Sequence, residues 1–475
     1  MRPLPFSIGQ ALGRSVDVSS QECENLFPVA GGDKGQVTLY GTPGTELFST
    51  FGSNPVRGWR QVGDYVYFVS RDTFYRMSNN GTLVSKGTVN TTGGNVVLSD
   101  NGDYDGSIAD EIIIVDGTDG YIFNITADTL TALTRTGDSA GFPVCEWVVF
   151  LNGRFIAGEA GTGRIFWSSL YEGTKWDALA FATAEKNPDD ISMGKEINGL
   201  LWLFGEKYIE VWGVTTSADL PFSPIGGAGG SVGLAAKWSV AKRGQALRFI
   251  GTDEDGNLSF YETQGYQLAD ASDTWLDYQL NQLTDYADAT AFSYSLEGHT
   301  FYYISFETDL VTYGVGANNL WFKVSTNKSR HIGKFHVYFN KKHLVSDYST
   351  GKIYELKSDA YTDNGAKIQR IATGQHIHGD QAMMFINALQ VEFEGGTALT
   401  SGQGSDPVAY LDLSKDGGHT YGNKKAKNLG KQGKYNTRAI WRGLGQCRDL
   451  VPRLTIDEPI KIVIMGLWSD IEADV

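Results

Sequence analysis

The sequence predicts an all-β protein: a β-propeller of about seven blades, with six to eight allowed, followed by a C-terminal β-sandwich-like module. Three observations predict this fold. The 475 residues include 58 glycines and 12% aromatic residues, a composition typical of many short strands joined by tight turns. A strand-pair motif recurs about every 45 residues, the length of a four-stranded propeller blade. The period stops near residue 385, where a second module is expected.

The repeat consists of seven pairs of apolar strands, and the second strand of each pair is rich in aromatic residues. The pairs start near residues 66, 111, 155, 201, 247, 300 and 343. In the sixth unit, residues 300–306 are expected to pair with residues 320–324 after a longer loop. Another strand is expected before most units, for example at 59–62, 146–150 and 238–240. Because one blade cannot bury both of its faces alone, the blades are expected to stack around an axis.

Seven aromatic residues of the repeat are expected to fill the layers between blades. They are Tyr67, Phe123, Phe166, Trp212, Phe260, Trp321 and Tyr354. The alternative is a pair of ordinary β-sandwiches with an accidental period. One segment departs from the strand pattern: Leu276, Leu280 and Leu283 have helical spacing behind Ser272 and Asp273, which predicts a short capped helix on a blade edge.

Three segments of the chain are predicted: residues 1–50 closing or flanking the propeller, 51–375 forming the propeller, and 376–475 forming the sandwich-like domain. Apolar and polar residues alternate at 391–394, 409–413 and 460–464, as in sandwich strands. The boundary between the two domains is soft, since residues 365–375 are themselves a candidate strand.

Charge is unevenly distributed along the chain. The formal net charge is −15, but residues 323–461 hold 21 lysine and arginine residues against 13 acidic ones. This opposition suits subunits that meet head to tail, and uneven solvated surface explains it equally well. The three cysteines have no metal-binding spacing and their odd number argues against a disulfide framework, so folding in a reducing cytosol is expected. No signal peptide or membrane span is expected.

Residues 414–421 match the Asp-box pattern S-x-D-x-G-x-T-aromatic. Its defining residues are Ser414, Asp416, Gly418 and Tyr421. The pattern predicts a structural hairpin turn, in which the aspartate binds backbone amides and glycine takes positive φ. It occurs in sialidase-like propellers and in unrelated sandwiches, and is a weak sign of glycosidase activity.

The other motifs favour structural interpretations, and no catalytic, cofactor or metal residue is predicted. Residues 253–257 resemble a calcium loop, but Gln264 stands where an EF-hand needs glutamate. His376, His378 and Asp380 offer three ligands on one strand face without a fourth. The glycine-rich residues 226–230 lack the following lysine of a phosphate loop, and nucleophile-elbow or zinc-protease motifs are absent.

A basic stretch follows the Asp box, with Trp441 and Tyr435 interleaved. Its cations include Lys424, Lys425, Lys427, Lys431, Lys434, Arg438, Arg442 and Arg448. We favour a docking face for the acidic propeller of a neighbouring subunit; solvated surface and DNA contact are the alternatives.

Motifs in order along nearly the whole chain resemble the packaged-DNA stabilisation proteins, also called tail accessory or tail hub proteins, of short-tailed phages. The opening motifs are residues 25–28 (Asn-Leu-Phe-Pro), 39–44 and 56–58. The most specific block is 175–185 (Lys-Trp-Asp-Ala-Leu-Ala-Phe-Ala-Thr-Ala-Glu), followed by Pro188, Asp189, Ile191 and residues 203–205, 209–212 and 221–222. The closing motifs are residues 416–418, 433–435, 441–442, 444–445 and 448–449.

The resemblance implies a non-enzymatic virion protein that assembles in the host cytoplasm as a ring, expected to be a hexamer, below the portal and its adaptor. Such a ring would close the channel, retain packaged DNA without sequence-specific binding, and dock the tail needle or tip and the tailspikes. No cofactor is expected. The alternatives are a carbohydrate-binding or glycan-degrading propeller, favoured by the Asp box and the many aromatics, and a scaffold propeller for host protein complexes.

Overall fold

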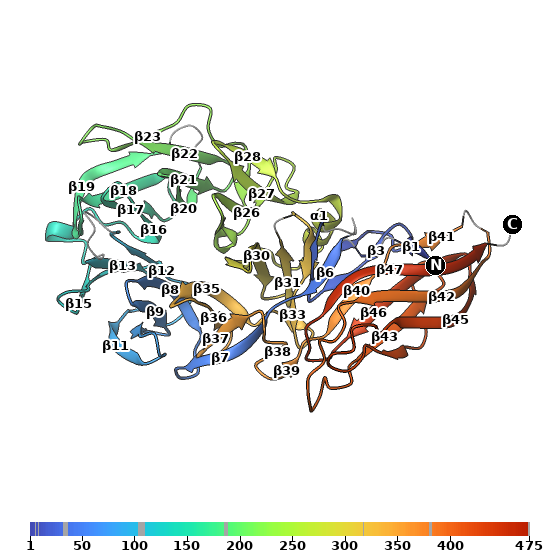
Figure 1. Cartoon of the computed structure of the whole chain (residues 1–475). Helices are drawn as coiled ribbons and strands as arrows, with labels where there is room; N and C mark the ends of the chain where they lie inside the picture. The colour runs from blue at the N-terminus through green and yellow to red at the C-terminus, as the bar shows by residue number, and fades with distance from the viewer. Residues whose placement is uncertain are drawn as a thin grey trace.

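The computed structural model describes residues 1–4, 6–7, 9–31, 37–102, 110–184, 189–316, 318–379 and 382–473. A ring of small antiparallel sheets forms one part of the molecule, and a two-layered β-sandwich, which holds both chain termini, extends from one side of it (Figure 1). The fold is therefore a propeller followed by a sandwich, as the sequence predicts.

Seven sheets, counted over the described residues, make up the propeller. The first sheet contains β8 (Val56–Val62), β9 (Tyr65–Ser70), β10 (Thr73–Met77) and β11 (Leu83–Thr88), and the second contains β12 (Val97–Asp100), β13 (Glu111–Val115), β14 (Gly120–Asn124) and β15 (Thr129–Ala132). The third sheet contains β16 (Cys145–Leu151), β17 (Arg154–Glu159), β18 (Arg164–Ser169) and β19 (Glu172–Thr183), and the fourth contains β20 (Ile191–Ile197), β21 (Leu200–Gly205), β22 (Ile209–Val214) and β23 (Phe222–Pro224). The fifth sheet contains β24 (Gly233–Leu234), β25 (Ala241–Arg243), β26 (Ala246–Thr252), β27 (Leu258–Gln264) and β28 (Gln267–Asp270). The sixth contains β29 (Thr290–Leu296), β30 (His299–Phe306), β31 (Val311–Val315) and β32 (Trp321–Lys323). The seventh contains β35 (Gly333–Phe339), β36 (Lys342–Asp347), β37 (Lys352–Lys357) and β7 (Gly44–Thr50).

The predicted strand period matches the second strand of every blade to within one residue. Two details of the prediction are wrong. In the sixth blade, β30 pairs with β31, and residues 321–323 form the fourth strand instead. The sequence does not indicate the strand at Val311–Val315, because Gly314 interrupts its apolar pattern. Residues 237–239 form a 3-10 turn rather than a strand, since the Ser239 hydroxyl donates to the Ala236 carbonyl at 2.6 Å and closes a local turn.

The chain start closes the seventh blade. β7 pairs antiparallel with β37, more than 300 residues later, with Glu46 opposite Glu355 and Thr45 opposite Leu356. This pairing gives β37 a partner that the end of the propeller segment does not supply. An unpaired strand edge would otherwise remain at the ring junction.

All seven aromatic residues expected between blades are buried: Tyr67, Phe123, Phe166, Trp212, Phe260, Trp321 and Tyr354. Among the ring contacts that cross from one blade to the next, two join pairs of these seven residues. The centroids of Tyr67 and Phe123 lie 5.6 Å apart, and those of Phe260 and Trp321 lie 4.3 Å apart. Each large ring adds both apolar area and an aromatic pair contact to the interface between blades.

The predicted helix is present as α1 (Thr274–Leu280). The Asp273 carboxylate accepts the Leu276 backbone N–H at 2.8 Å, which is an N-cap contact. Leu276 and Leu280 are buried from the same helix face, and α1 packs on β27.

Two sheets form the sandwich, and N-terminal strands belong to both. One sheet contains β45 (Ala439–Cys447), β42 (Met384–Phe393), β47 (Val463–Ala473), β6 (Thr38–Gly41) and β5 (Leu26–Val29), with β1 (Arg2–Leu4) also on β47. The other contains β4 (Cys23–Glu24), β40 (Arg370–Thr373), β46 (Asp449–Ile456), β43 (Val408–Ser414) and β44 (Lys425–Asn428), with β41 (Ile377–His378) also on β46. Two short pairs complete the fold: β2 (Ala11–Leu12) with β3 (Ser20–Gln21), and β33 (Ser325–Thr326) with β34 (Ser329–Arg330). β38 (Thr362–Asp363) pairs with β39 (Ala366–Lys367) and with β7, so both extend the sheet of the seventh blade.

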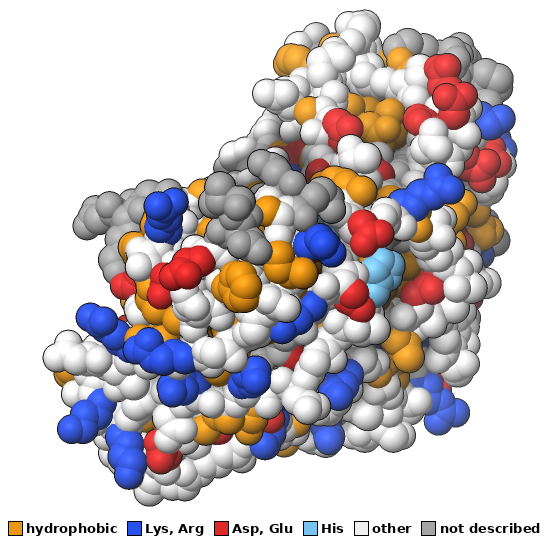
Figure 2. All heavy atoms as spheres, turned by 90° about the vertical axis from the view of Figure 1, so that its right-hand side faces the viewer, with side chains coloured by type: hydrophobic (Ala, Val, Ile, Leu, Met, Phe, Trp, Pro, Cys, Tyr) orange, Lys and Arg blue, Asp and Glu red, His pale blue; other side chains and the backbone are white. Residues whose placement is uncertain are grey.

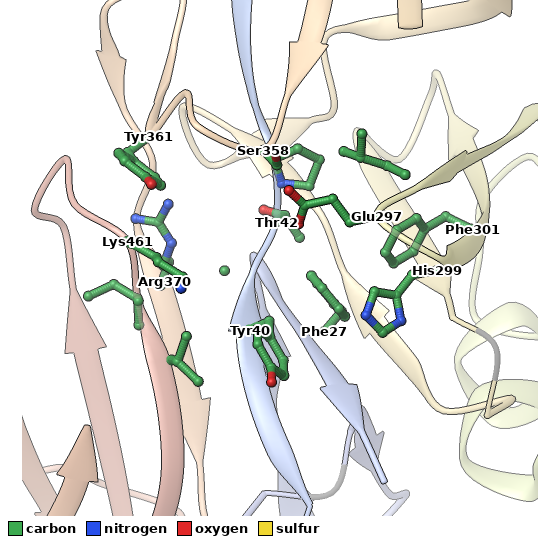
Figure 3. A pocket seen from close by; sticks show the side chains of 15 residues that line it. Phe27, Tyr40, Thr42, Glu297, His299, Phe301, Ser358, Tyr361, Arg370 and Lys461 are labelled. Atoms are coloured by element: carbon green, nitrogen blue, oxygen red, sulfur yellow. The ribbon is translucent and has the colours of Figure 1, made fainter. Parts of the chain in front are cut away.

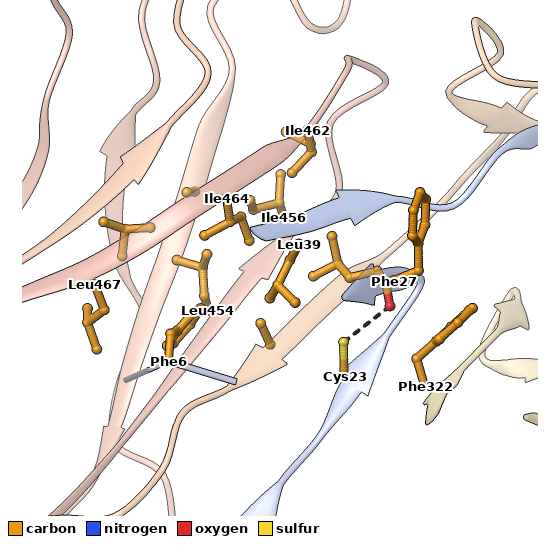
Figure 4. Packing of buried hydrophobic residues seen from close by; sticks show 14 of the residues in the cluster. Phe6, Cys23, Phe27, Leu39, Phe322, Leu454, Ile456, Ile462, Ile464 and Leu467 are labelled. Carbon is orange, nitrogen blue, oxygen red and sulfur yellow. Dashed lines mark hydrogen bonds between the residues drawn. The ribbon is translucent and has the colours of Figure 1, made fainter. Parts of the chain in front are cut away.

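One hydrophobic core joins the sandwich to the propeller. It combines side chains of both sandwich sheets, such as Leu454 and Leu467, with Phe322 of the sixth blade and Phe27 of the chain start (Figure 4). β4 also pairs with β32, at Glu24 opposite Lys323, so that one sheet runs from the sixth blade into the sandwich. The division into segments at residues 50 and 375 stays a prediction, and the chain start contributes strands to both units.

The three cysteines, Cys23, Cys145 and Cys447, are buried and free. The Cys23 thiol donates to the Leu26 carbonyl at 3.2 Å inside the shared core (Figure 4). No described helix has the length and apolar character needed to cross a membrane.

Candidate docking surface

The Asp-box residues form the turn between β43 and β44. The Ser414 hydroxyl donates to Asp416 Oδ1 at 2.7 Å and accepts the Gly418 N–H at 2.8 Å, while Asp416 Oδ1 accepts the Thr420 N–H at 2.9 Å. Gly418 has φ +93°, in the region that favours glycine. Hydrogen bonds from Thr420 and Ser414 hold the pKa of Asp416 well below its usual range.

Tyr421 ends this turn and packs against a cation of the neighbouring strand. The guanidinium carbon of Arg453 lies 3.7 Å from the centre of the Tyr421 ring. Arg453 also pairs with the buried carboxylate of Asp412. The turn is therefore anchored on the sheet, and its carboxylate is fully used by local hydrogen bonds.

The basic residues lie along one side of the sandwich, where the edge strands β44 and β45 of the two sheets meet. The indole Nε1 of buried Trp441 in β45 donates to the Lys425 carbonyl in β44 at 2.7 Å and so links the two edges. We call this surface the basic edge; it consists of Lys424, Lys425, Lys427, Lys431, Lys434, Arg438, Arg442 and Arg448, all of which are exposed.

Few of these cations are neutralised within the chain. Among the described residues, the seven apart from Arg448 form no ion pair with an acidic side chain; Lys424 reaches only the Thr455 hydroxyl, at 3.4 Å. All four residues of β44 are exposed, and the Tyr435 ring between the two strands is 76% exposed. Seen from the sandwich end, lysine and arginine side chains predominate over the lower part of the molecule (Figure 2).

Two of the predicted weak metal candidates, His376 and Asp253, are engaged in other contacts. His376 Nδ1 lies 2.8 Å from Asp449 Oδ2 and its Nε2 lies 2.8 Å from the Val16 carbonyl, which ties the chain start to the sandwich. Asp380 lies outside the described residues. Asp253 caps the turn between β26 and β27, and no cluster of three potential metal ligands occurs in the described part of the chain.

A glycan-degrading propeller would need free paired carboxylates in a pocket. One cavity, of about 790 Å³, is lined by Asp189, Glu206, Asp253 and Glu254 together with Tyr286. Asp189 Oδ2 accepts the backbone N–H groups of Lys207 and Tyr208 at 2.7 and 2.9 Å, and Asp253 holds its own turn. Two of the four carboxylates are therefore structural, which does not favour the glycosidase alternative.

In the block at residues 175–185 that carries the most specific part of the resemblance, residues 175–183 lie on β19, the outer strand of the third blade. Trp176 is buried there, and its Nε1 donates to the Gly173 carbonyl at 2.7 Å. Its packing partner is Phe142, whose ring centre is 5.1 Å away. This tryptophan has a packing role; Glu185 and Pro188 lie outside the described residues.

Two family models match consecutive parts of the chain. Residues 2–361 match the model described as bacteriophage P22 Gp10, beta-propeller, and residues 369–472 match that described as bacteriophage P22 Gp10, beta-sandwich. No curated protein matches the sequence significantly.

Solved propeller structures are similar only distantly. Virginiamycin B lyase from Staphylococcus aureus has 11% identity and a TM-score of 0.43 over 64% of this chain and 94% of the lyase. BamB from Moraxella catarrhalis has 11% identity and a TM-score of 0.39 over 74% of this chain and 98% of BamB. Similarity at this level says nothing about what the chain binds or does.

Proposed function

The chain belongs to the bacteriophage P22 Gp10 family of phage structural proteins, and from this premise we propose that it is a non-enzymatic subunit of a tail hub. In this proposal the subunits assemble in the host cytoplasm as a ring, expected to be hexameric, below the portal-bound adaptor. The ring closes the channel and retains the packaged DNA, and it carries the tail needle or tip and the tailspikes. The observation that supports this most is the pair of family matches, in order, over nearly the whole chain.

The architecture suits a part that must resist pressure without moving. A retained genome presses on its seal continuously, so the subunit needs rigid units that are firmly joined. Here the chain start supplies β7 to the seventh blade and β1, β4, β5 and β6 to the sandwich, so both units are connected by shared sheets and by one core. Such cross-connection makes bending between the units costly, because it would expose packed apolar area.

We propose that the basic edge docks on an acidic surface of a neighbouring subunit. Residues 323–461 carry a formal charge of +8, and the rest of the chain carries −23. Cations along β44, β45 and the adjoining loops face solvent, and an acidic propeller of the next subunit would neutralise them. In a closed ring every such heterologous contact is satisfied. DNA contact and simple solvation are the other two interpretations.

The test replaces Lys425, Lys427 and Lys431 together by glutamate. Assembly on a purified portal–adaptor complex is followed at physiological salt, with Lys207→Glu/Lys242→Glu, at two exposed propeller lysines, as a control for charge reversal elsewhere on the surface. We expect the apparent affinity of the chain for its assembly on the portal–adaptor complex to fall roughly tenfold or more in the triple variant and to change little in the control. Equal assembly of both variants would contradict docking. Normal assembly on the portal–adaptor complex, together with loss of DNA when the triple variant is added to packaged heads, would assign the basic edge to DNA contact.

The proposed role itself is tested in particles. Heads of the phage that encodes this chain are packaged in its absence, and the retained DNA is measured with and without added protein. We expect the genome to leak from unsupplemented heads and to remain in supplemented ones. Full retention without the protein would contradict the proposal.

A further inference from the structure

The most unusual buried group outside the docking surface is the side chain of Arg370 in β40. The residue is 1% exposed, its Nε has no hydrogen-bond partner, and its Nη1 reaches the carbonyls of Ile368 and Glu458 only at 3.5 and 3.4 Å. It forms no ion pair within 4.0 Å with any described residue. A buried cation with so few close partners is costly unless another group satisfies it.

The guanidinium borders a cavity of about 70 Å³ at the junction of propeller and sandwich. Figure 3 shows Arg370, Lys461 and Tyr361 on one side of this cavity and Tyr40, Phe27 and Glu297 on the other. Gly41 makes room for the arginine, since a Cβ built there would lie 2.8 Å from Arg370 Nε. The site therefore combines a rigidly placed arginine with a void next to it.

The chemistry of the lining selects an anion. An arginine fork matches the geometry of carboxylate and phosphate oxygens, and Lys461 adds a second positive charge. Lys461 already pairs with Glu394, at 2.9 Å, so Arg370 is the main attraction. Glu297 opposes an anion, but it is exposed on the turn between β29 and β30 and can rotate into solvent.

Nearby acids do not replace such a ligand. Asp363 is the acid with the largest effect on Arg370, and burial raises the pKa of Asp363 to about 6. Its oxygens accept the hydroxyls of Thr45 and Thr326 at 3.3 and 2.9 Å instead of pairing with the arginine.

We propose that this junction cavity binds one small oxyanion, a phosphate or a carboxylate group, on Arg370. The volume excludes a nucleotide or a sugar, and admits inorganic phosphate, acetate, or the tip of an acidic side chain from another chain. Because the walls come from the chain start, the sixth blade and the sandwich, a bound anion would fasten the two units to each other.

Binding is measured by isothermal titration of the full chain with inorganic phosphate and, separately, with acetate, at constant ionic strength set with chloride. We expect saturable binding that is lost in Arg370→Gln. In Glu297→Gln, which changes only an exposed turn, we expect roughly fivefold tighter binding because a like charge is removed. Lys461→Met should weaken binding less than Arg370→Gln does.

The two anions separate the possible sources of the ligand. Tighter binding of phosphate points to a free ion, and tighter binding of acetate points to a carboxylate supplied by another chain. No saturable binding of either anion to the wild-type protein would mean that water fills the cavity, and would overturn the proposal. Affinity unchanged in Glu297→Gln would overturn it as well, even if Arg370→Gln failed to fold.

Discussion

Acidification should weaken the junction between the sixth and seventh blades through His331. This residue is 2% exposed, its Nδ1 accepts the Gly333 N–H at 3.0 Å, and its ring centre lies 5.5 Å from that of Tyr303. Burial, assisted by neighbouring Arg330, lowers the pKa of His331 to about 3, against 6.5 for the ordinary group. The folded protein therefore holds this ring neutral across a pH range in which the unfolded chain protonates it.

The sign follows from the lowered pKa. The contribution of neutral His331 to the free energy of unfolding is fully present above pH 6.5 and is lost as the pH falls from 6.5 towards 3. Between pH 7 and pH 4.5 the histidine is protonated in the unfolded chain but not in the folded chain. This difference lowers the free energy of unfolding by about 3 kcal/mol.

The perturbation is His331→Asn, because the asparagine Oδ1 can accept the Gly333 N–H in place of Nδ1. At pH 7 we expect the variant to be less stable, since it leaves part of the ring site empty. At pH 4.5 the difference in unfolding free energy between wild type and variant should be smaller by about 3 kcal/mol. Urea unfolding followed by tryptophan fluorescence measures both, with His378→Asn on exposed β41 as the control for removing a histidine. A difference in unfolding free energy that is the same at both pH values would show that burial does not lower the pKa of His331.

Three further predictions concern the contacts that hold the fold. Cleavage at a protease site inserted at exposed Ser53, between β7 and β8, should leave the two fragments bound to each other, because the N-terminal fragment pairs with both units. Gel filtration should show the fragments eluting together. Release of the short fragment would contradict the assigned strand pairing. Asp273→Ala should cost about 1 kcal/mol of unfolding free energy through the lost helix cap, and an unchanged urea midpoint would show that the cap contributes nothing. Asp416→Asn should lower the melting temperature slightly, by weakening the Asp-box turn, and should leave assembly on the portal–adaptor complex unchanged; impaired assembly would give this turn a docking role.

The sequence predicts the inner strands of the blades well because they are buried on both faces. Ile112, Ile113 and Ile114 of β13 are all fully buried, and such runs repeat at blade spacing. Outer strands have a weaker signal: three of the four residues of β15 are exposed, so their pattern is that of a loop. The sequence period thus reports the packed part of each blade.

Contacts between distant segments could not be predicted. The pairing of β7 with β37 depends on ring closure, and nothing local in residues 44–50 indicates it. The Asp-box turn, in contrast, is made by residues within a few positions of one another, so its pattern is visible in the sequence. The cations of the basic edge are a visible cluster, but their arrangement along two adjoining edge strands and the loops next to them requires the fold. Arg370 was missed, because a single arginine in a short alternating strand does not reveal that it is buried.

Light scattering on a mixture of the purified chain with a portal–adaptor complex tests the proposed hub role most directly. We expect a complex heavier than the portal–adaptor assembly by several copies of the 51.9 kDa chain, in a number set by the ring. An unchanged mass of the portal–adaptor complex, with this chain eluting separately, would contradict the proposed hub role.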